Sequence, residues 1–164
     1  GCGKTGVLTL APFLPGLRRK QRCLLLSPSL TILVELARNL SGKGGKGGKN
    51  FFLRHGFLPE TQSEELPRCA VLSSDADLAV SLEHGAQFKA VSLQLEAERV
   101  LRELAACRVV LCNWQALVES KLWTHLRDRK FFDLLFIDEA HHSAAQGYRR
   151  VREHFADADI CLVT

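Results

Sequence analysis

Two acidic residues follow an apolar segment near the end of the chain and could help to hold a divalent cation. Residues 134–137 are apolar at every position, and Asp138 and Glu139 come directly after them. Such a run predicts a strand that is buried on both faces, as in the centre of a parallel sheet. Because these sheets bind ligands at the carboxyl ends of their strands, the pair could hold Mg²⁺ beside a nucleotide. The acidic start of an ordinary helix would explain the same two residues equally well.

The first residues of the chain contain the second half of a phosphate-binding loop. They read G-C-G-K-T-G, where the full pattern is G-x-x-x-x-G-K-[ST]. Gly1 and Gly3 would let backbone N–H groups surround phosphate oxygens. Lys4 would neutralise the β- and γ-phosphates, and the hydroxyl of Thr5 would bind Mg²⁺. The triplet G-K-T is common by itself, but followed by an apolar strand and D-E-A-H it favours a site for Mg-ATP.

These two segments together resemble motifs I and II of the superfamily 2 helicases and translocases, the DEAD/DEAH-box class. Residues 131–164 are most similar to the restriction-subunit-like branch, in which D-E-A-H-H precedes a helix and a strand that ends in Thr. The resemblance covers essentially the whole chain, and both ends fall inside motifs of the class. We therefore expect residues 1–164 to form a single ATP-binding lobe of a longer protein.

The resemblance also implies roles for individual residues. Thr5 and Asp138 would hold Mg²⁺, and Glu139 would polarise the attacking water. His141 would link the γ-phosphate site to Thr164 in the next motif and to a second lobe. In P-loop ATPases an arginine finger can contribute about three to five orders of magnitude in rate. In this class the second lobe supplies it, so we expect the isolated lobe to bind ATP weakly and to hydrolyse it barely, if at all.

Two junctions between a strand and a helix are candidates for contact with nucleic acid. Residues 23–26 predict a strand, and Ser29 is a predicted N-cap of the helix that contains Thr31. Residues 108–112 predict another strand, and Asn113 is the N-cap that follows it. The junctions resemble motifs Ia and Ib of the class, which implies that Ser29, Thr31 and Asn113 face nucleic acid. The restriction-subunit branch favours DNA slightly over RNA.

Strands alternate with helices along the chain, which predicts a doubly wound α/β domain with a mostly parallel sheet, as in a RecA-like lobe. Residues 41–50 read S-G-K-G-G-K-G-G-K-N and predict a flexible insertion, because they contain nothing to bury. Residues 51–67 have no clean periodicity and predict an irregular connection. The predicted strands are 23–26, 68–72, 108–112, 134–137 and 160–163, and the predicted helices are 7–14, 30–40, 92–107, 114–126 and 144–155.

The composition suits one globular domain. Of the 164 residues, 46% are hydrophobic and 24% are charged, and the net charge of +4 permits nucleic acid as a partner without requiring it. No apolar run reaches the roughly 20 residues that span a bilayer. The six cysteines contain no C-x-x-C pair, which argues against a zinc ribbon and for reduced thiols in an intracellular compartment, cytoplasm or nucleus.

Other functions remain open at this point. The chain could be a P-loop NTPase that does not act on nucleic acid, although it lacks the L-S-G-G-Q-like signature of ABC-type ATPases. It could also be a degenerate nucleotide-binding module. A metal site at His141, His142 and His154 lacks the spacing of H-E-x-x-H, and a hydrolytic pair of Glu139 and His141 lacks a nucleophile motif such as G-x-S-x-G.

Overall fold

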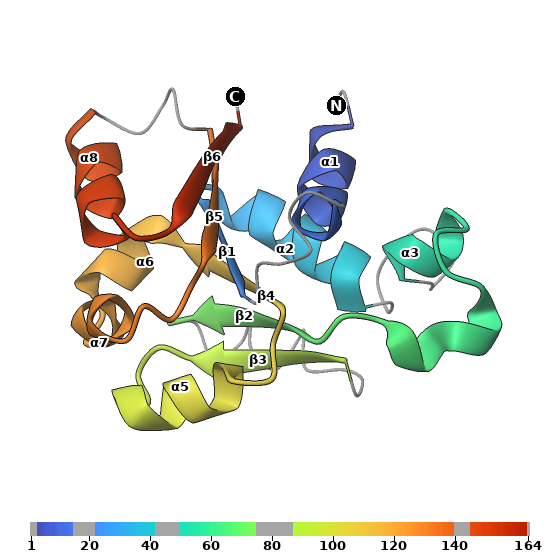
Figure 1. Ribbon diagram of the computed structural model, residues 1–164, viewed down its shortest axis with the longest axis horizontal. Helices are drawn as coiled ribbons and strands as arrows, with labels where there is room; N and C mark the ends of the chain where they lie inside the picture. The colour runs from blue at the N-terminus through green and yellow to red at the C-terminus, as the bar shows by residue number, and fades with distance from the viewer. Residues whose placement is uncertain (1–2, 15–21, 42–49, 75–86, 140–144, 164) are drawn as a thin grey trace.

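A computed structural model describes residues 3–14, 22–41, 50–74, 87–139 and 145–163. Its strands form a single sheet in the order β3-β2-β4-β1-β5-β6, and every neighbouring pair is parallel (Figure 1). The predicted α/β fold with a parallel sheet is therefore confirmed. The strands are β1 (Cys23–Ser27), β2 (Cys69–Ser73), β3 (Phe88–Ser92), β4 (Val109–Asn113), β5 (Leu134–Asp138) and β6 (Asp159–Val163).

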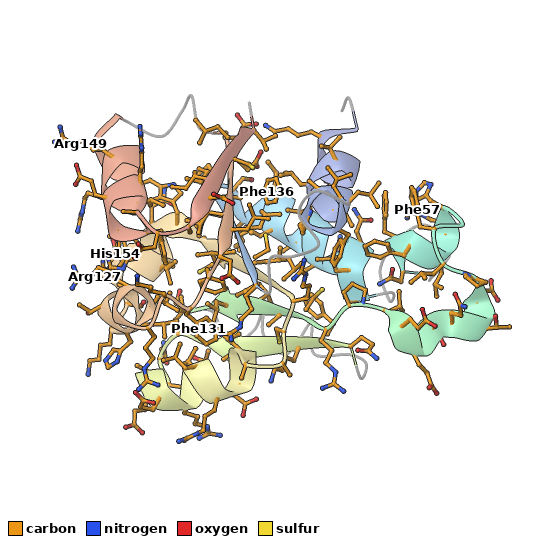
Figure 2. The ribbon with its side chains drawn as sticks, in the orientation of Figure 1. Phe57, Arg127, Phe131, Phe136, Arg149 and His154 are labelled. Atoms are coloured by element: carbon orange, nitrogen blue, oxygen red, sulfur yellow. The ribbon has the colours of Figure 1, made fainter. Side chains whose placement is uncertain are left out.

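Helices cover both faces of the sheet (Figure 1). Leu24 and Leu26 of β1 pack in one core cluster with residues of α5 to α8, whereas Leu25 packs in a second cluster with residues of α1, α2 and α3. Phe136 of β5 points to the α1 side (Figure 2). This alternation follows from the period of two along a strand. The helices are α1 (Lys4–Leu10), α2 (Leu30–Ser41), α3 (Phe51–Arg54), α5 (Ala97–Leu104), α6 (Trp114–Glu119), α7 (Leu122–Asp128) and α8 (Ala145–His154).

The central strand β1 lies at the point where the chain changes direction across the sheet. After β1 the chain builds β2 and β3 on one side, returns to β4 beside β1, and then crosses to β5 and β6 on the other side. All five residues of β1 are buried, and so are those of β2 and β5. Open α/β sheets bind ligands at such a switch point, outside the carboxyl ends of the strands. A ligand site is therefore expected at the carboxyl ends of β4, β1 and β5.

The middle of the chain differs from the sequence prediction. Strand β3 was not predicted, and the helix expected over 92–107 is the shorter α5, because Ser92 ends β3. The helix expected over 114–126 is two helices, α6 and α7. Ser120 separates them with an extended backbone, ψ 155°, and its hydroxyl donates a hydrogen bond of 2.6 Å to the carbonyl of Leu117.

The connection after α2 is partly regular. Residues 51–67 contain α3 and a 3-10 segment, Glu60–Glu65, so the prediction of an irregular connection is wrong in part. Asn50 accepts a hydrogen bond from the Phe52 N–H and caps α3. Of the predicted insertion, 42–49 lie outside the described residues, while Ser41 belongs to α2. In the part of the chain that the structure covers, no helix is long and apolar enough to cross a membrane.

Candidate functional site: a lysine and two carboxylates at the end of β5

Three charged side chains from opposite ends of the chain meet at the carboxyl end of the sheet. Lys4 begins α1, Asp138 ends β5, and Glu139 follows it. The Nζ of Lys4 lies 3.0 Å from Oδ1 of Asp138, and it donates a hydrogen bond to Oε1 of Glu139, 135 positions away in the sequence. The structure thus brings together the cation of one predicted motif and both carboxylates of the other.

The three groups differ in their exposure to solvent. The side chain of Asp138 is 0% exposed, whereas those of Lys4 and Glu139 are 28% and 25% exposed. The hydrogen bond to Glu139 raises the pKa of Lys4, burial opposes it, and the Asp138 carboxylate adds to the rise. The ammonium therefore stays protonated at neutral pH, between a buried carboxylate and one that faces the solvent.

Glu139 has an unusual backbone conformation for a residue with a side chain. Its φ is +53°, in the left-handed region, where the described residues other than glycine include only Glu139 and Lys130. Such a conformation costs about 1–3 kcal/mol and persists where the surrounding structure imposes it, often at functional sites. Here it turns the chain sharply at the end of β5 and leaves the Glu139 carboxylate in contact with Lys4.

Asp138 has another buried partner, which the sequence analysis missed. The hydroxyl of Ser27, at the end of β1, donates a hydrogen bond of 3.1 Å to Oδ2 of Asp138. Apart from the ion pair with Lys4, Oδ1 of Asp138 has no hydrogen-bond partner in the described part of the chain. The sequence gives no sign of this contact, because a serine before a proline is typical of an ordinary strand end. Only the pairing of β1 with β5 reveals it.

The donor set at this site fits a magnesium ion that arrives with a nucleotide. Mg²⁺ usually keeps several waters and is bound through one or two carboxylates plus substrate phosphates, rather than by a cage made only of protein. Among the residues that the structure describes, no group of three His, Cys, Asp or Glu side chains could hold a metal. Asp138 offers one buried carboxylate oxygen, Oδ1, whose partner in the described part of the chain is the Lys4 ammonium, and an oxygen of this kind can bind such an ion.

The other predicted nucleotide-site residues are only partly described. Gly3 is the N-cap of α1 with a φ of +74°, a conformation that glycine adopts without strain, and Thr5 lies half-buried in the first turn of α1. Gly1, His141 and Thr164 lie outside the described residues. The roles of these five residues stay predictions.

The predicted nucleic-acid residues lie at the neighbouring ends of β1 and β4. Ser29 and Asn113 are N-caps as expected: they accept hydrogen bonds from the N–H groups of Ile32, at 3.4 Å, and Ala116, at 3.1 Å. Asn113 also joins the two junctions, because its Nδ2 donates a hydrogen bond of 3.0 Å to the carbonyl of Pro28. Thr31 is exposed in the first turn of α2. Contact with nucleic acid stays a prediction for Ser29, Thr31 and Asn113.

His154 has a structural environment. Its ring stacks on Trp123 with centroids 3.5 Å apart, and its Nε2 lies 2.6 Å from the carbonyl oxygen of Trp123. Figure 2 shows His154 at the end of α8 that lies near Arg127 of α7, away from the carboxyl ends of the strands. His141 and His142 lie outside the described residues. The environment of His154 indicates that it joins α7 to α8, which gives no support to a histidine metal site.

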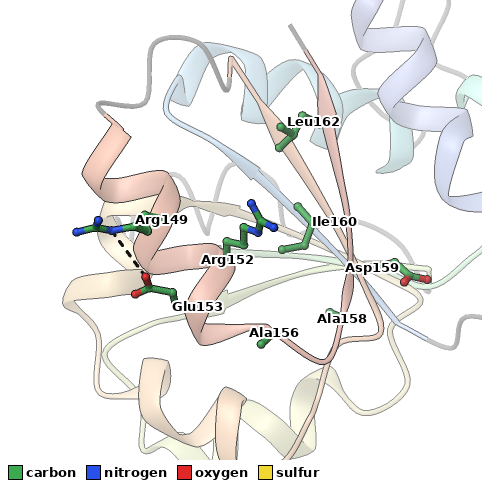
Figure 3. Close-up of a pocket in the computed structure, with 8 residues that line it drawn as sticks. All are labelled: Arg149, Arg152, Glu153, Ala156, Ala158, Asp159, Ile160 and Leu162. Carbon is green, nitrogen blue, oxygen red and sulfur yellow. Dashed lines mark ion pairs between the residues drawn. The ribbon is translucent and has the colours of Figure 1, made fainter.

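A surface groove of about 790 Å³ lies between α8 and β6, away from the lysine and the carboxylates (Figure 3). Arg149 and Glu153 form an ion pair of 3.7 Å at one side of it, and both side chains are 70% exposed. Lys4, Asp138 and Glu139 do not line this groove. Its residues are Arg149, Arg152, Glu153, Ala156, Ala158, Asp159, Ile160 and Leu162.

Comparisons with known proteins found a matching family model and a similar solved structure. The model of the family described as "Type III restriction enzyme, res subunit" matches residues 1–163. A similar solved structure is that of a nuclease-deletion mutant of the Type ISP restriction-modification enzyme LlaGI in complex with a DNA substrate mimic, at 13% identity and a TM-score of 0.42. The match covers 100% of this chain and 15% of the other. No curated protein matches this sequence.

Proposed function

Because this chain belongs to the family of the type III restriction enzyme res subunit, and is thus a helicase-type ATP-binding lobe, we propose that it binds and hydrolyses Mg-ATP to drive movement along nucleic acid. The observation that carries the proposal is the contact of Lys4 with both Asp138 and Glu139. This contact brings the lysine that we assign to the phosphates and an acidic pair together at the switch point of a parallel sheet, where such sheets bind ligands.

Lys4 is the residue that we assign to the phosphates. Without nucleotide its ammonium is balanced by the carboxylates of Asp138 and Glu139. The β- and γ-phosphates of ATP would replace these partners, and the long side chain can move to them because it is 28% exposed. Moving the ammonium to the phosphates also frees Oδ1 of Asp138. Binding of ATP and binding of a metal at Asp138 are therefore expected to favour each other.

Asp138 and Thr5 are the residues that we assign to magnesium. When bound, Mg²⁺ neutralises the charge that develops on the phosphates during transfer. Asp138 would contribute Oδ1, directly or through a water, and the hydroxyl of Thr5 would contribute from the first turn of α1. The burial of Asp138 strengthens its attraction for a cation, because solvent screens a buried charge less than an exposed one.

Glu139 is the residue that we assign to the attacking water. Its carboxylate is 25% exposed, so a water can reach it, and its backbone is fixed by the left-handed turn at the end of β5. Phosphoryl transfer to water depends mainly on positioning and electrostatics, and a fixed carboxylate orients the water and accepts its proton. We assign the Glu139 carboxylate to this step once Lys4 has moved to the phosphates.

The proposal also covers the nucleic acid along which the protein would move and a second lobe that would complete the active site. The family description names a restriction enzyme, which supports DNA as the polymer. Ser29, Thr31 and Asn113 lie at adjacent strand ends, where the phosphate backbone would pass. A second lobe would supply the arginine that this lobe lacks in the proposed mechanism. The isolated lobe is therefore expected to bind ATP weakly and to turn it over slowly.

The test is an assay of ATP hydrolysis by the chain extended through a second lobe. Hydrolysis is measured without polymer and with single-stranded DNA, duplex DNA or RNA, and Glu139→Gln serves as the control for contaminating ATPases. We expect one DNA form to stimulate hydrolysis, and the substitution to abolish it. Strong hydrolysis that no polymer changes would contradict the helicase function and favour an NTPase with another task. No hydrolysis in any condition would favour a nucleotide-binding module.

A further inference from the structure

Ser27 places a buried hydroxyl against Asp138, the proposed metal ligand. It ends β1, is 0% exposed, and its Oγ lies 3.1 Å from Oδ2 of Asp138. The register explains the contact: Leu26 of β1 pairs with Ile137 of β5, so the next residues of both strands lie side by side at the end of the sheet. The hydrogen bond therefore follows from the pairing of two rigid central strands.

The single proton of the Ser27 hydroxyl is directed to Asp138. The Oγ accepts a hydrogen bond from the Ser29 N–H at 3.2 Å, which leaves the hydroxyl free to act as a donor. Its possible acceptors are Oδ2 of Asp138, at 3.1 Å, and the carbonyl of Ser29, at 3.5 Å. The carboxylate is the closer and the charged acceptor, and charge-assisted hydrogen bonds are roughly twice as strong as neutral ones.

The turn that carries Ser27 is held in place by its neighbours. Ser29 caps α2, and Asn113 of β4 donates a hydrogen bond to the carbonyl of Pro28. The hydroxyl thus belongs to a turn that is tied to α2 and to β4, and its proton reaches β5. An oxygen supported in this way can fix the orientation of a carboxylate, as outer partners do for many metal ligands.

We propose that Ser27 is a positioning residue that holds Asp138 with Oδ2 turned inward and Oδ1 turned to the cation. In the nucleotide-free protein that cation is the ammonium of Lys4, and in the Mg-ATP complex it is the metal. Ser27 itself touches neither nucleotide nor metal. This inference rests on the proposed binding of Mg-ATP and adds a residue to which the sequence analysis assigned no role.

The experiment measures how strongly Mg²⁺ tightens the binding of ATP. A fluorescent ATP analogue is titrated into the full-length protein that carries this sequence, once with Mg²⁺ and once with EDTA. For Ser27→Ala we expect the tightening by Mg²⁺ to fall about 10- to 100-fold, the usual effect of removing an outer partner of a metal ligand. The affinity in EDTA should stay within about twofold of wild type, because Ser27 does not contact the phosphates.

Two further variants separate positioning from folding. Ser73→Ala removes a buried serine hydroxyl from the end of β2, two strands away from β1, and should leave the tightening by Mg²⁺ unchanged. Ser27→Thr keeps a hydroxyl and should therefore retain at least part of the tightening by Mg²⁺ that Ser27→Ala loses. If Ser27→Ala does not fold, Ser27→Cys can be compared with wild type in the same titration, since a thiol is of similar size to a hydroxyl but is a weak donor.

Three outcomes would overturn the inference. If Ser27→Ala keeps the wild-type response to Mg²⁺, the hydroxyl only satisfies a buried carboxylate. If affinity in EDTA falls as much as affinity with Mg²⁺, Ser27 supports the fold of the site and not the metal ligand. If wild type itself binds no ATP analogue, the proposed function fails first, and the failure is seen before any variant is compared.

Discussion

The neighbouring strands β5 and β6 belong to the same sheet but differ in burial: β5 is buried and ends at the candidate site, whereas β6 forms part of the surface. They pair in register over all five residues, from Leu134 with Asp159 to Asp138 with Val163. All five residues of β5 are buried, whereas those of β6 are exposed or half-buried. The difference follows from position, because β5 lies between β1 and β6 while β6 is at the edge of the described sheet.

The ion pairs beside the two strands differ in the same way. At the end of β5, Lys4 pairs with a carboxylate that is 0% exposed and that comes from the other end of the chain. Beside β6, Arg149 pairs with Glu153 four residues later on the same helix, with 70% of each side chain exposed. Exposed pairs of this kind contribute little to stability, about 0–1 kcal/mol. A buried carboxylate needs partners, because a buried charge without a partner is costly.

The largest expected effect is on hydrolysis. Glu139→Gln in the extended chain should lower the ATPase rate by about 10²- to 10⁴-fold, because the amide cannot accept the proton of the attacking water. The matched change beside β6, Glu153→Gln, removes a carboxylate from an exposed pair and should leave the rate within about twofold. Steady-state phosphate release measures both. Equal losses in the two variants would mean that the comparison between the regions is wrong.

The next effect is on stability. Leu135 of β5 is 0% exposed and Leu162 of β6 is 50% exposed. Leu135→Ala should lower the free energy of unfolding by about 2–5 kcal/mol, since it leaves a cavity in the core. Leu162→Ala should lower it by less than about 0.5 kcal/mol, as for most surface substitutions. Urea unfolding followed by circular dichroism compares them. A loss at Leu162 as large as that at Leu135 would show that β6 is covered in solution.

A smaller effect should appear in the reactivity of thiols. Burial raises the pKa of Cys112, near the carboxyl end of the central strand β4, and to a lesser extent that of Cys161, in the edge strand β6. Both are mostly thiols at pH 8, so access to the reagent decides the rate. We expect a maleimide to label Cys161 at least about tenfold faster than Cys112, and urea to remove the difference. Peptide mass spectrometry assigns the sites, and faster labelling of Cys112 would contradict the burial of the central strands.

The smallest effect concerns the ammonium of Lys4. Its pKa is raised from 10.5, first of all by the hydrogen bond to Glu139. The ion pair therefore contributes to stability below that pH, and the contribution is lost as the pH rises through the higher folded value. Only the unprotonated amine is acetylated. At pH 9–10 a smaller fraction of Lys4 is unprotonated than of a lysine without a raised pKa. Acetylation of Lys4 should therefore be severalfold slower than that of Lys130, whose side chain is 71% exposed. Glu139→Gln should reduce the difference in rate between Lys4 and Lys130. If Lys4 is acetylated at the same rate in this variant as in wild type, the hydrogen bond to Glu139 does not raise its pKa.

The sequence was sufficient for the parts of the fold that depend on long apolar runs. Strands β1, β2, β4 and β5 coincide with runs of buried apolar residues, and β6 contains the apolar residues Ile160 to Val163, so their positions were predicted to within one or two residues. Strand β3 was missed because it is the other edge strand, with a pattern of burial that includes Lys89 and only two fully buried residues. Edge strands have one neighbour, so their sequences are less constrained than those of central strands.

The sequence motifs predicted which charged residues would lie together, but not all of their partners. Lys4, Asp138 and Glu139 were expected to act together, and the structure places them in contact. The contribution of Ser27 depends on the register of β1 against β5, a relation between residues 111 positions apart, and no local pattern indicates it. The left-handed backbone of Glu139 was also not predicted, because glutamate has no preference for that conformation.

The most direct test of the account is the affinity for ATP of the protein and of two lysine variants. Lys4→Met removes the cation at the end of β5, and Lys130→Met removes an exposed lysine that lies 3.2 Å from Asp157. In a titration with a fluorescent ATP analogue and Mg²⁺, we predict that Lys4→Met weakens binding about 10- to 100-fold, the loss expected for one or two charge-assisted hydrogen bonds. Lys130→Met should bind like wild type. Unchanged affinity in Lys4→Met, with the fold intact, would show that the lysine and its two carboxylates do not form the nucleotide site.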